Sequence, residues 1–144
     1  MSCHFHDKKV FPYAAKELYG IVADVKNYPS FLPGTLAATI LEEGPGFMRA
    51  ELSIGAAFMK ASYTSKVLLD PPHRVDVVYE QGPFKDLKSY WIFHPLGDKE
   101  TEVEFFIDFS FKSRFLQKAM EGMFQEGIQD LMEAFEKRAK ELLG

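Results

Sequence analysis

The chain has 144 residues, a mass of 16.4 kDa, a net charge of −4 at pH 7 and a pI near 5.6. A single domain of this size buries about two thirds of its extended-chain surface, so its core needs neither disulfides nor metals. The acidic balance argues against a DNA partner, no apolar run approaches the roughly 18 residues of a membrane span, and the only cysteine, Cys3, excludes an intrachain disulfide. We therefore expect one domain over residues 1–144 in a reducing, cytoplasmic compartment.

Alternating apolar and polar residues predict seven strands and one early helix, separated by short turns that contain Pro and Gly. In chain order, the first strand lies near residues 4–11, the helix begins after Pro12 and ends before Tyr28-Pro29, and further strands lie near residues 35–43, 48–54, 60–70, 74–80, 87–94 and 103–111. The last is the clearest, because every second residue from Val103 to Phe111 is apolar. Strands joined by short turns favour an antiparallel sheet, and hence an α+β fold.

The longest pattern predicts one continuous helix from Ser113, the expected N-cap, to near Gly144. Apolar residues recur on one face at Phe115/Leu116, Ala119/Met120, Met123/Phe124, Ile128, Leu131/Met132, Phe135, Ala139 and Leu142. A helix of about 30 residues is roughly 45 Å long, and only the apolar face of the sheet can cover it. The sheet must therefore curve around the helix. Because Phe, Tyr and Trp make up 15% of the chain, we expect aromatic residues to line a space between the two.

Several motifs follow one another along the chain: Tyr28-Pro29-Ser30-Phe31-Leu32-Pro33-Gly34, Gly82-Pro83-Phe84-Lys85-Asp86-Leu87, Trp91-Ile92-Phe93 with Pro95, and Phe109-Ser110-Phe111-Lys112-Ser113. Together they resemble the coenzyme Q-binding START-domain family, which also contains the bacterial ribosome-association toxins. The resemblance covers nearly the whole chain. It implies a helix-grip (START/Bet v 1-like) fold, in which a curved seven-stranded antiparallel sheet wraps around a long C-terminal helix and encloses a hydrophobic cavity. It also implies binding of ubiquinone or other lipids without turnover.

One position separates two branches of that family. The quinone-binding eukaryotic members typically carry Trp, often followed by Cys, after the proline that corresponds to Pro33. Here Gly34 and Thr35 follow instead, which is more similar to the bacterial toxin branch.

The expected cavity is lined by inward-facing residues of the sheet and the last helix. Its predicted lining is Phe31, Leu32, Leu52, Tyr63, Val67, Val77, Tyr79, Trp91, Phe93, Phe105, Ile107, Phe109, Met120, Met123, Phe124, Ile128 and Met132. Met adapts to irregular apolar guests, and Tyr hydroxyls or the Trp indole N–H can hydrogen-bond the carbonyls of a quinone. For any single aromatic residue a solid core is the favoured alternative, and it is the resemblance that favours a cavity.

Residues 54–60 lie where two strands must be joined but lack the Asn, Asp and Ser that hairpin tips prefer. Two interpretations stay open. The segment folds back onto the core, or Phe58 and Met59 form an apolar lip that contacts a membrane or a partner while ligand enters.

Basic residues gather in two segments that the fold brings together if the strands carrying Trp91 and Phe109 are neighbours. They are Lys85, Lys88, Lys112, Arg114 and Lys118. The favoured interpretation is a solvated rim, and the alternative is a patch that contacts ribosomal RNA or anionic lipid head groups.

The chain lacks the motifs of common nucleophilic, metal-dependent and phosphate-binding enzymes. Cys3, His4 and His6 form the only cluster with metal-ligand chemistry, and a frayed terminus is the favoured interpretation. His73 and His94 have no carboxylate nearby in the sequence to orient them. We therefore expect no catalytic residue, no metal site and no required cofactor, although bound ubiquinone or another isoprenoid lipid is compatible with the pattern.

Three functions are compared at this point. The first is non-enzymatic binding of ubiquinone or a related isoprenoid quinone or lipid, in support of respiratory electron transport, with peripheral contact at the inner face of the cytoplasmic membrane. The second, which the resemblance implies, is a toxin that binds the large ribosomal subunit and blocks subunit joining. The third and weakest is a polyketide cyclase-like enzyme, since the expected inward positions are almost entirely apolar.

Overall fold

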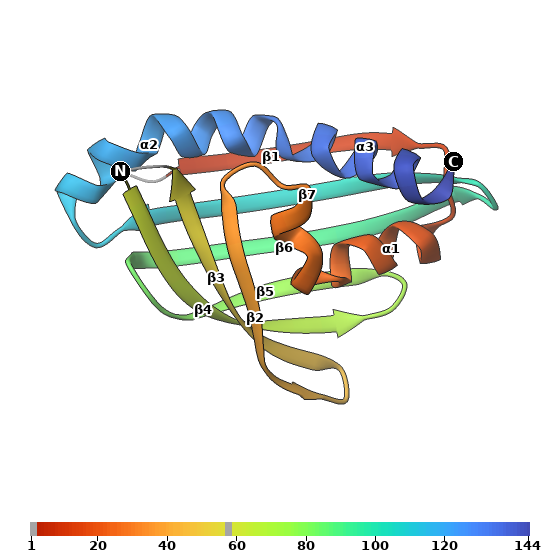
Figure 1. Cartoon of the computed structure of the whole chain (residues 1–144). Coiled ribbons are helices and arrows are strands. Elements are labelled where there is room, and N and C mark those ends of the chain that lie inside the picture. The colour runs from red at the N-terminus through yellow and green to blue at the C-terminus, as the bar shows by residue number, and fades with distance from the viewer. Residues whose placement is uncertain (1–2, 57–58) are drawn as a thin grey trace.

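The computed structural model describes residues 3–56 and 59–144 (Figure 1). Its strands are β1 (Cys3–Phe11), β2 (Thr35–Gly44), β3 (Phe47–Ala56), β4 (Met59–Asp70), β5 (Arg74–Gln81), β6 (Phe84–Gly97) and β7 (Glu100–Phe111). The helices are α1 (Ala15–Ala23), the 3-10 helix η1 (Val25–Ser30), α2 (Arg114–Gln129) and α3 (Leu131–Leu143). The predicted strands are therefore confirmed, and each is longer at one end or both than the sequence indicated.

The strands form one antiparallel sheet in the order β1-β7-β6-β5-β4-β3-β2. Strands β2 to β7 follow one another as hairpins, and β1 closes the far edge by pairing with β7. At the β2–β3 turn, Gly46 has a φ of +75°, which glycine adopts without steric cost. In Figure 1 the sheet curves from β1 and β7, along which α2 and α3 run, round to β2 and β3. This confirms the α+β, helix-grip arrangement.

Alternation along β7 places its apolar residues on the inner face as predicted. Val103, Phe105 and Phe109 are each 2% exposed or less. Trp91 of β6 lies opposite Phe105, and the two ring centroids are 4.4 Å apart. Period-two burial of large side chains gives this part of the sheet a solid aromatic layer.

The single terminal helix that the periodicity predicts is in fact two helices, which meet at Asp130. The expected N-cap is confirmed, because the Ser113 hydroxyl accepts a hydrogen bond from the backbone N–H of Leu116. The Asp130 carbonyl accepts the first hydrogen bond of α3, from Ala134 N–H, while the Asp130 side chain makes no capping hydrogen bond. Apolar spacing continues across this break, which is why periodicity alone missed it.

The early helix also differs from the prediction in its second half. α1 ends at Ala23, and the next turn, η1, is a 3-10 helix that contains Pro29. Asp24, with φ −84° and ψ 63°, leaves helical geometry between them. α1 packs against α3 and β6, where the rings of Tyr19 and Phe93 are 5.7 Å apart. The pair α1–η1 thus carries the chain from β1 to β2 and covers one end of the sheet.

Candidate ligand-binding cavity

A cavity of about 130 Å³, here called the inner chamber, lies between the sheet and α3. Its floor is formed by inward-facing residues of β3 to β7, and its roof by η1 and α3. The lining residues are Val25, Tyr28, Leu32, Thr35, Ala50, Leu52, Tyr63, Ser65, Val67, Val75, Val77, Leu87, Ser89, Trp91, Phe105, Ile107, Leu131 and Phe135. The chamber is therefore apolar apart from a few hydroxyl groups.

A larger cavity of about 380 Å³, the outer chamber, adjoins the inner one. The two share a wall made of Thr35, Tyr63, Leu87, Ile107 and Leu131. The outer chamber is also lined by Pro33, Gly34, Ile54, Gly55, Phe84, Phe109, Gly127, Ile128 and Asp130. Since Pro33, Gly34 and Asp130 are exposed, this chamber reaches the surface between the η1–β2 loop and the junction of α2 with α3.

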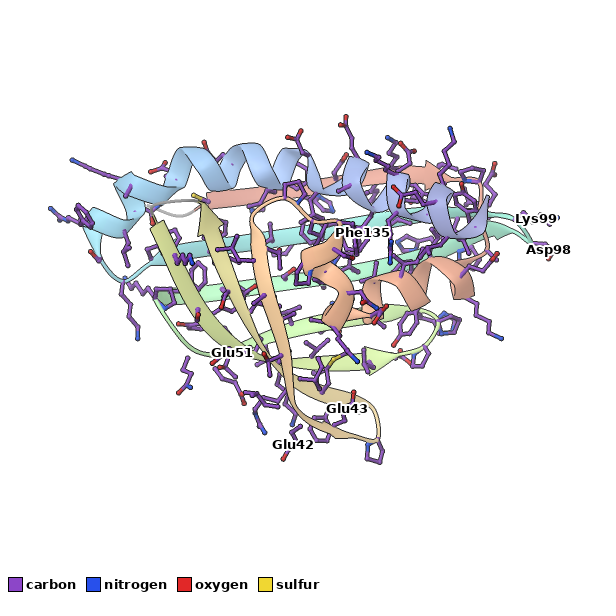
Figure 2. The ribbon with its side chains drawn as sticks, in the orientation of Figure 1. Glu42, Glu43, Glu51, Asp98, Lys99 and Phe135 are labelled. Atoms are coloured by element: carbon purple, nitrogen blue, oxygen red, sulfur yellow. The ribbon has the colours of Figure 1, made fainter. Side chains whose placement is uncertain are left out.

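Aromatic rings hold α3 above the inner chamber. Phe135 points from α3 toward the sheet (Figure 2), and its ring centroid is 4.8 Å from that of Trp91. On the other side it meets Tyr28 at 5.6 Å and Phe31 at 5.2 Å, both edge to face. These contacts fix the height of the roof and so the size of the chamber.

Hydroxyl groups of Ser, Thr and Tyr side chains give the inner chamber its polar character. Ser65 is 4% and Ser89 is 7% exposed, and the Ser65 hydroxyl has no hydrogen-bond partner among the described residues. Burial raises the pKa of Tyr63 to about 12, so its phenol stays neutral at physiological pH. Burial also raises the pKa of Tyr28, whose hydroxyl donates to the Val22 carbonyl. The chamber can thus offer neutral donors and acceptors but no charge.

Many residues of the predicted lining do line one chamber or the other. They are Leu32, Leu52, Tyr63, Val67, Val77, Trp91, Phe105, Ile107, Phe109 and Ile128. That these side chains bind a ligand stays a prediction.

Four residues of the predicted lining lie elsewhere. Phe93 and Met132 are each 2% exposed and are packed as core. The Tyr79 hydroxyl accepts a hydrogen bond from Phe84 N–H, and its ring packs on Phe84 rather than facing the space. Phe31 lies on the outer side of Phe135, beneath the Arg138 guanidinium. Alternation and helix periodicity identify buried faces but do not separate core from cavity wall.

Other predicted residues lie outside what the structure describes. These are Phe58 of the lip, together with the side chains of Met59, Met120, Met123 and Phe124. The lip hypothesis and the methionine contribution of α2 therefore remain predictions.

Sequence reasoning missed several lining residues, among them Ser65, Ser89 and Ala50. Each occupies an inward position of a strand whose other inward residues are large and apolar. A small side chain at such a position leaves space between the sheet and the helices. A small residue among large apolar residues on the inward face of a strand is therefore the sequence feature that could have predicted the cavity wall.

The predicted basic residues surround the turn from β7 to α2. Backbone N–H of Lys112 donates to the Pro83 carbonyl, which places Lys112 beside Lys85. Arg114 and Lys118 follow in α2, while Lys88 lies further along β6 opposite Asp108. All five side chains are exposed, and so is Phe115 at 71%. We call Phe115 with Lys85, Lys112, Arg114 and Lys118 the Phe115 surface.

A polar cluster on the outer face of the sheet gives His94 a carboxylate partner, Glu104, that is not its neighbour in the sequence. Nε2 of His94 lies 3.0 Å from Oε1 of Glu104, and Nε2 of His6 lies 2.8 Å from Oε2 of the same carboxylate. Hydrogen bonds to Glu104 lower its pKa below the usual value; the bond from His94 has the largest effect and that from His6 the next largest. The positive charge of Lys8 lowers this pKa further. His6 is 98 residues and His94 is 10 residues from Glu104 in the sequence, so local spacing could not predict that the three side chains meet.

This cluster predicts a specific loss of stability in acid. Because the pKa of Glu104 is lower in the folded than in the unfolded chain, its ionised form stabilises the fold fully above its ordinary value of 4.5 and less as pH falls through the folded value. Glu104→Gln should lower the free energy of unfolding by about 1 kcal/mol at pH 7 and make it fall less steeply below pH 4.5. Urea unfolding of wild type and Glu104→Gln at several pH values measures this. The prediction is wrong if the free energies of unfolding of the two proteins fall equally steeply with decreasing pH.

Among the described residues, no group of three or more His, Cys, Asp or Glu side chains is placed to hold a metal ion. The helices in residues 3–56 and 59–144 are also too short or too polar for any of them to cross a membrane.

Comparison with known proteins gives a family match over most of the chain. The family described as polyketide cyclase/dehydrase and lipid transport matches residues 11–136. A ribosome association toxin, RatA, of Pseudomonas aeruginosa is 33% identical over 144 residues, the full length of both chains. The mitochondrial coenzyme Q-binding protein COQ10 homolog B of Xenopus laevis is 32% identical over 97% of this chain and 59% of its own length.

Solved structures show the same fold. The crystal structure of the Zhui aromatase/cyclase from Streptomyces sp. R1128 has a TM-score of 0.83, with 97% of this chain and 94% of the other covered. At 20% identity this is a likeness of fold alone. Similar chains thus carry names of a toxin, a quinone-binding protein and a cyclase, and the choice among them depends on the cavity and the surface.

Proposed function

The chain belongs to the polyketide cyclase/dehydrase and lipid transport family, and we propose that it binds ubiquinone or a related isoprenoid quinone in its cavity without changing it chemically. The observation that carries the proposal is the pair of adjoining chambers between the sheet and the terminal helices, apolar along the walls and open at Asp130. A carrier of this kind would load and unload at the inner face of the cytoplasmic membrane.

The size and chemistry of the space support an isoprenoid guest. Each five-carbon unit that moves from water into an apolar chamber contributes about 4 kcal/mol, from about 0.8 kcal/mol per methylene. The outer chamber, about 380 Å³, has room for an apolar chain and an exit for the part that does not fit. A solid core would have offered neither.

The lining argues for binding rather than catalysis. Among the described residues, the ionisable side chains that line the two chambers are Tyr28, Tyr63 and Asp130. Only Asp130 carries a carboxyl group, and it lies where the outer chamber reaches the surface. Burial holds the pKa of Tyr63 at about 12. General acid–base catalysis works best with a group whose pKa lies near the operating pH, and the chamber contains none with such a shift.

Extraction of the purified protein tests the proposal. Organic extraction followed by mass spectrometry should recover a quinone in near-stoichiometric amount. Delipidated protein should take up ubiquinone from liposomes. If protein from a quinone-producing host carries no quinone and takes up none, the carrier proposal is wrong.

A second candidate function, binding to the large ribosomal subunit, is favoured by the toxin relatives and by the Phe115 surface. Four basic side chains around a ring that is 71% exposed suit a phosphate backbone with unstacked bases. This surface lies at the β7–α2 turn and includes no residue of the two chambers' described lining. The two functions are therefore compatible in one molecule.

Charge reversal tests this candidate. Added protein should increase free subunits in sucrose-gradient profiles of ribosomes, and replacing Lys85, Lys112, Arg114 and Lys118 by Glu should reduce that effect at least ten-fold, because each lost phosphate contact weakens binding. A matched variant changes the exposed Lys16, Lys26, Lys137 and Lys140 to Glu. Equal loss in both variants would show only an effect of net charge, and no effect of wild-type protein would remove the candidate.

A further inference from the structure

The Ser65 hydroxyl is the most unusual group in the inner chamber. It is buried, with the residue 4% exposed, and it has no hydrogen-bond partner among the described residues. A buried polar group without a partner destabilises a fold. Ser65 sits on the inner face of β4 between Tyr63 and Val67, which line the same chamber. An apolar residue would fit this position at lower cost, so the hydroxyl needs another explanation.

The dimensions of the inner chamber suggest what approaches Ser65. Its volume is about 130 Å³, and an engineered apolar cavity of about 150 Å³ in another protein binds benzene. One unsubstituted six-membered ring therefore approaches the limit of this chamber, and the substituents of a larger quinone ring need space in the adjoining outer chamber. The aromatic side chains of Trp91 and Phe105, whose ring centroids are 4.4 Å apart, belong to the lining and offer such a ring aromatic contacts.

We propose that Ser65 is the polar anchor of the ligand: its hydroxyl donates a hydrogen bond to a carbonyl oxygen of a single-ring head group in the inner chamber, while the apolar tail lies in the outer chamber. This inference rests on the proposed carrier function and adds the orientation of the ligand and the group that recognises it. The neutral phenol of Tyr63, in the wall shared by the chambers, is a further donor, and the hydroxyls of Ser89 and Thr35 also belong to the described lining.

The opposite orientation is less favourable for two reasons. A tail in the inner chamber leaves the Ser65 hydroxyl unpaired and buried. A head in the outer chamber lies near the exposed Asp130, where water competes for its carbonyl oxygens. With the head inside, both ends of the ligand meet matching surroundings.

The chain provides its own reporter for this orientation. Trp91 is the only tryptophan in the sequence and lines the inner chamber with Ser65. A quinone ring held beside it should quench its fluorescence strongly. Titration of Trp91 emission with ubiquinone-2, a quinone with two isoprene units, therefore gives both affinity and proximity. Competition with farnesene, an isoprenoid hydrocarbon without a head group, measures binding of the tail alone.

Ser65→Ala should weaken ubiquinone-2 binding roughly five-fold, the effect of one hydrogen bond, and leave farnesene binding unchanged. Ser65→Thr keeps the hydroxyl and should retain more of the affinity than Ser65→Ala does, although its added methyl group takes up part of the chamber. Ser62→Ala is the matched control on the same strand, because the Ser62 hydroxyl faces outward and pairs with that of Ser53 at 2.9 Å. The melting temperature of empty Ser65→Ala should equal or exceed that of wild type.

The outcomes separate the two proposals. If wild type binds ubiquinone-2 and farnesene but Ser65→Ala binds both as wild type does, the anchor is wrong and the carrier function stands. If Ser65→Ala loses both probes equally, the residue shapes the chamber and the anchor is again wrong. If wild type binds neither probe, the carrier function fails and the anchor with it.

Discussion

Phe135→Ala should lower the free energy of unfolding by about 3–5 kcal/mol, as truncation of a fully buried aromatic side chain does. Phe135 is 3% exposed and joins α3 to the sheet through Trp91, to η1 through Tyr28, and to Phe31, the residue that follows η1. Its loss opens the roof of the inner chamber and removes three edge-to-face ring contacts at once. The surroundings cannot collapse easily onto the gap, because a chamber already lies beneath it.

Urea denaturation followed by circular dichroism measures this change. Phe115→Ala makes the same substitution at a ring that is 71% exposed, and we expect it to change stability by less than about 0.5 kcal/mol. If the two variants lose similar stability, Phe135 does not hold α3 to the sheet as the structure indicates. Phe135→Leu should recover part of the loss.

Local patterns were sufficient for most of the fold. Period two in residues 103–111 predicted β7 and its inner face, and the Ser113 cap located the start of α2. They failed where the apolar spacing continued through a local break in geometry. Asp130 interrupts the terminal helix without disturbing its apolar face, and Asp24 does the same between α1 and η1.

The cavity was predictable in kind but only partly in detail. Alternation along a strand predicts that an inward residue is buried. Whether that residue packs in the solid core or lines the cavity depends on which residues of the helices lie opposite it. Phe93 meets Tyr19 of α1 and is packed, while Trp91, two residues earlier, faces the chamber beside Phe135. Small residues such as Ala50 and Ser65 create the space, and they are the residues that a search for aromatic side chains overlooks.

The polar cluster on the outer face of the sheet also could not be predicted from local sequence patterns. His94 and Glu104 lie on the two strands of the β6–β7 hairpin, and His6 reaches Glu104 only because β1 pairs with β7 at the closing edge. No spacing rule links residues 6 and 104. Contacts of this kind need the topology first, and only then the chemistry of the side chains.

Filling the inner chamber should have the largest effect on ligand binding. Ala50 lies on the inner face of β3 opposite Ser65, is 2% exposed and lines the inner chamber. Ala50→Phe would place a ring where the head group is expected, so ubiquinone-2 affinity should fall at least a hundred-fold. Since the new ring enters existing space, the cost in stability should be at or below the 1–3 kcal/mol that is typical of overpacking.

Ala37→Phe provides the matched control, because Ala37 is exposed on the neighbouring strand β2 and the same ring there should leave ubiquinone-2 binding unchanged. Ala50→Phe also separates the two candidate functions, since the Phe115 surface is distinct from the chambers. A folded Ala50→Phe protein that has lost the quinone but still releases ribosomal subunits would assign the two activities to different faces. If it still binds ubiquinone-2 with wild-type affinity, the ring of the quinone does not occupy the inner chamber, because the two rings cannot share about 130 Å³.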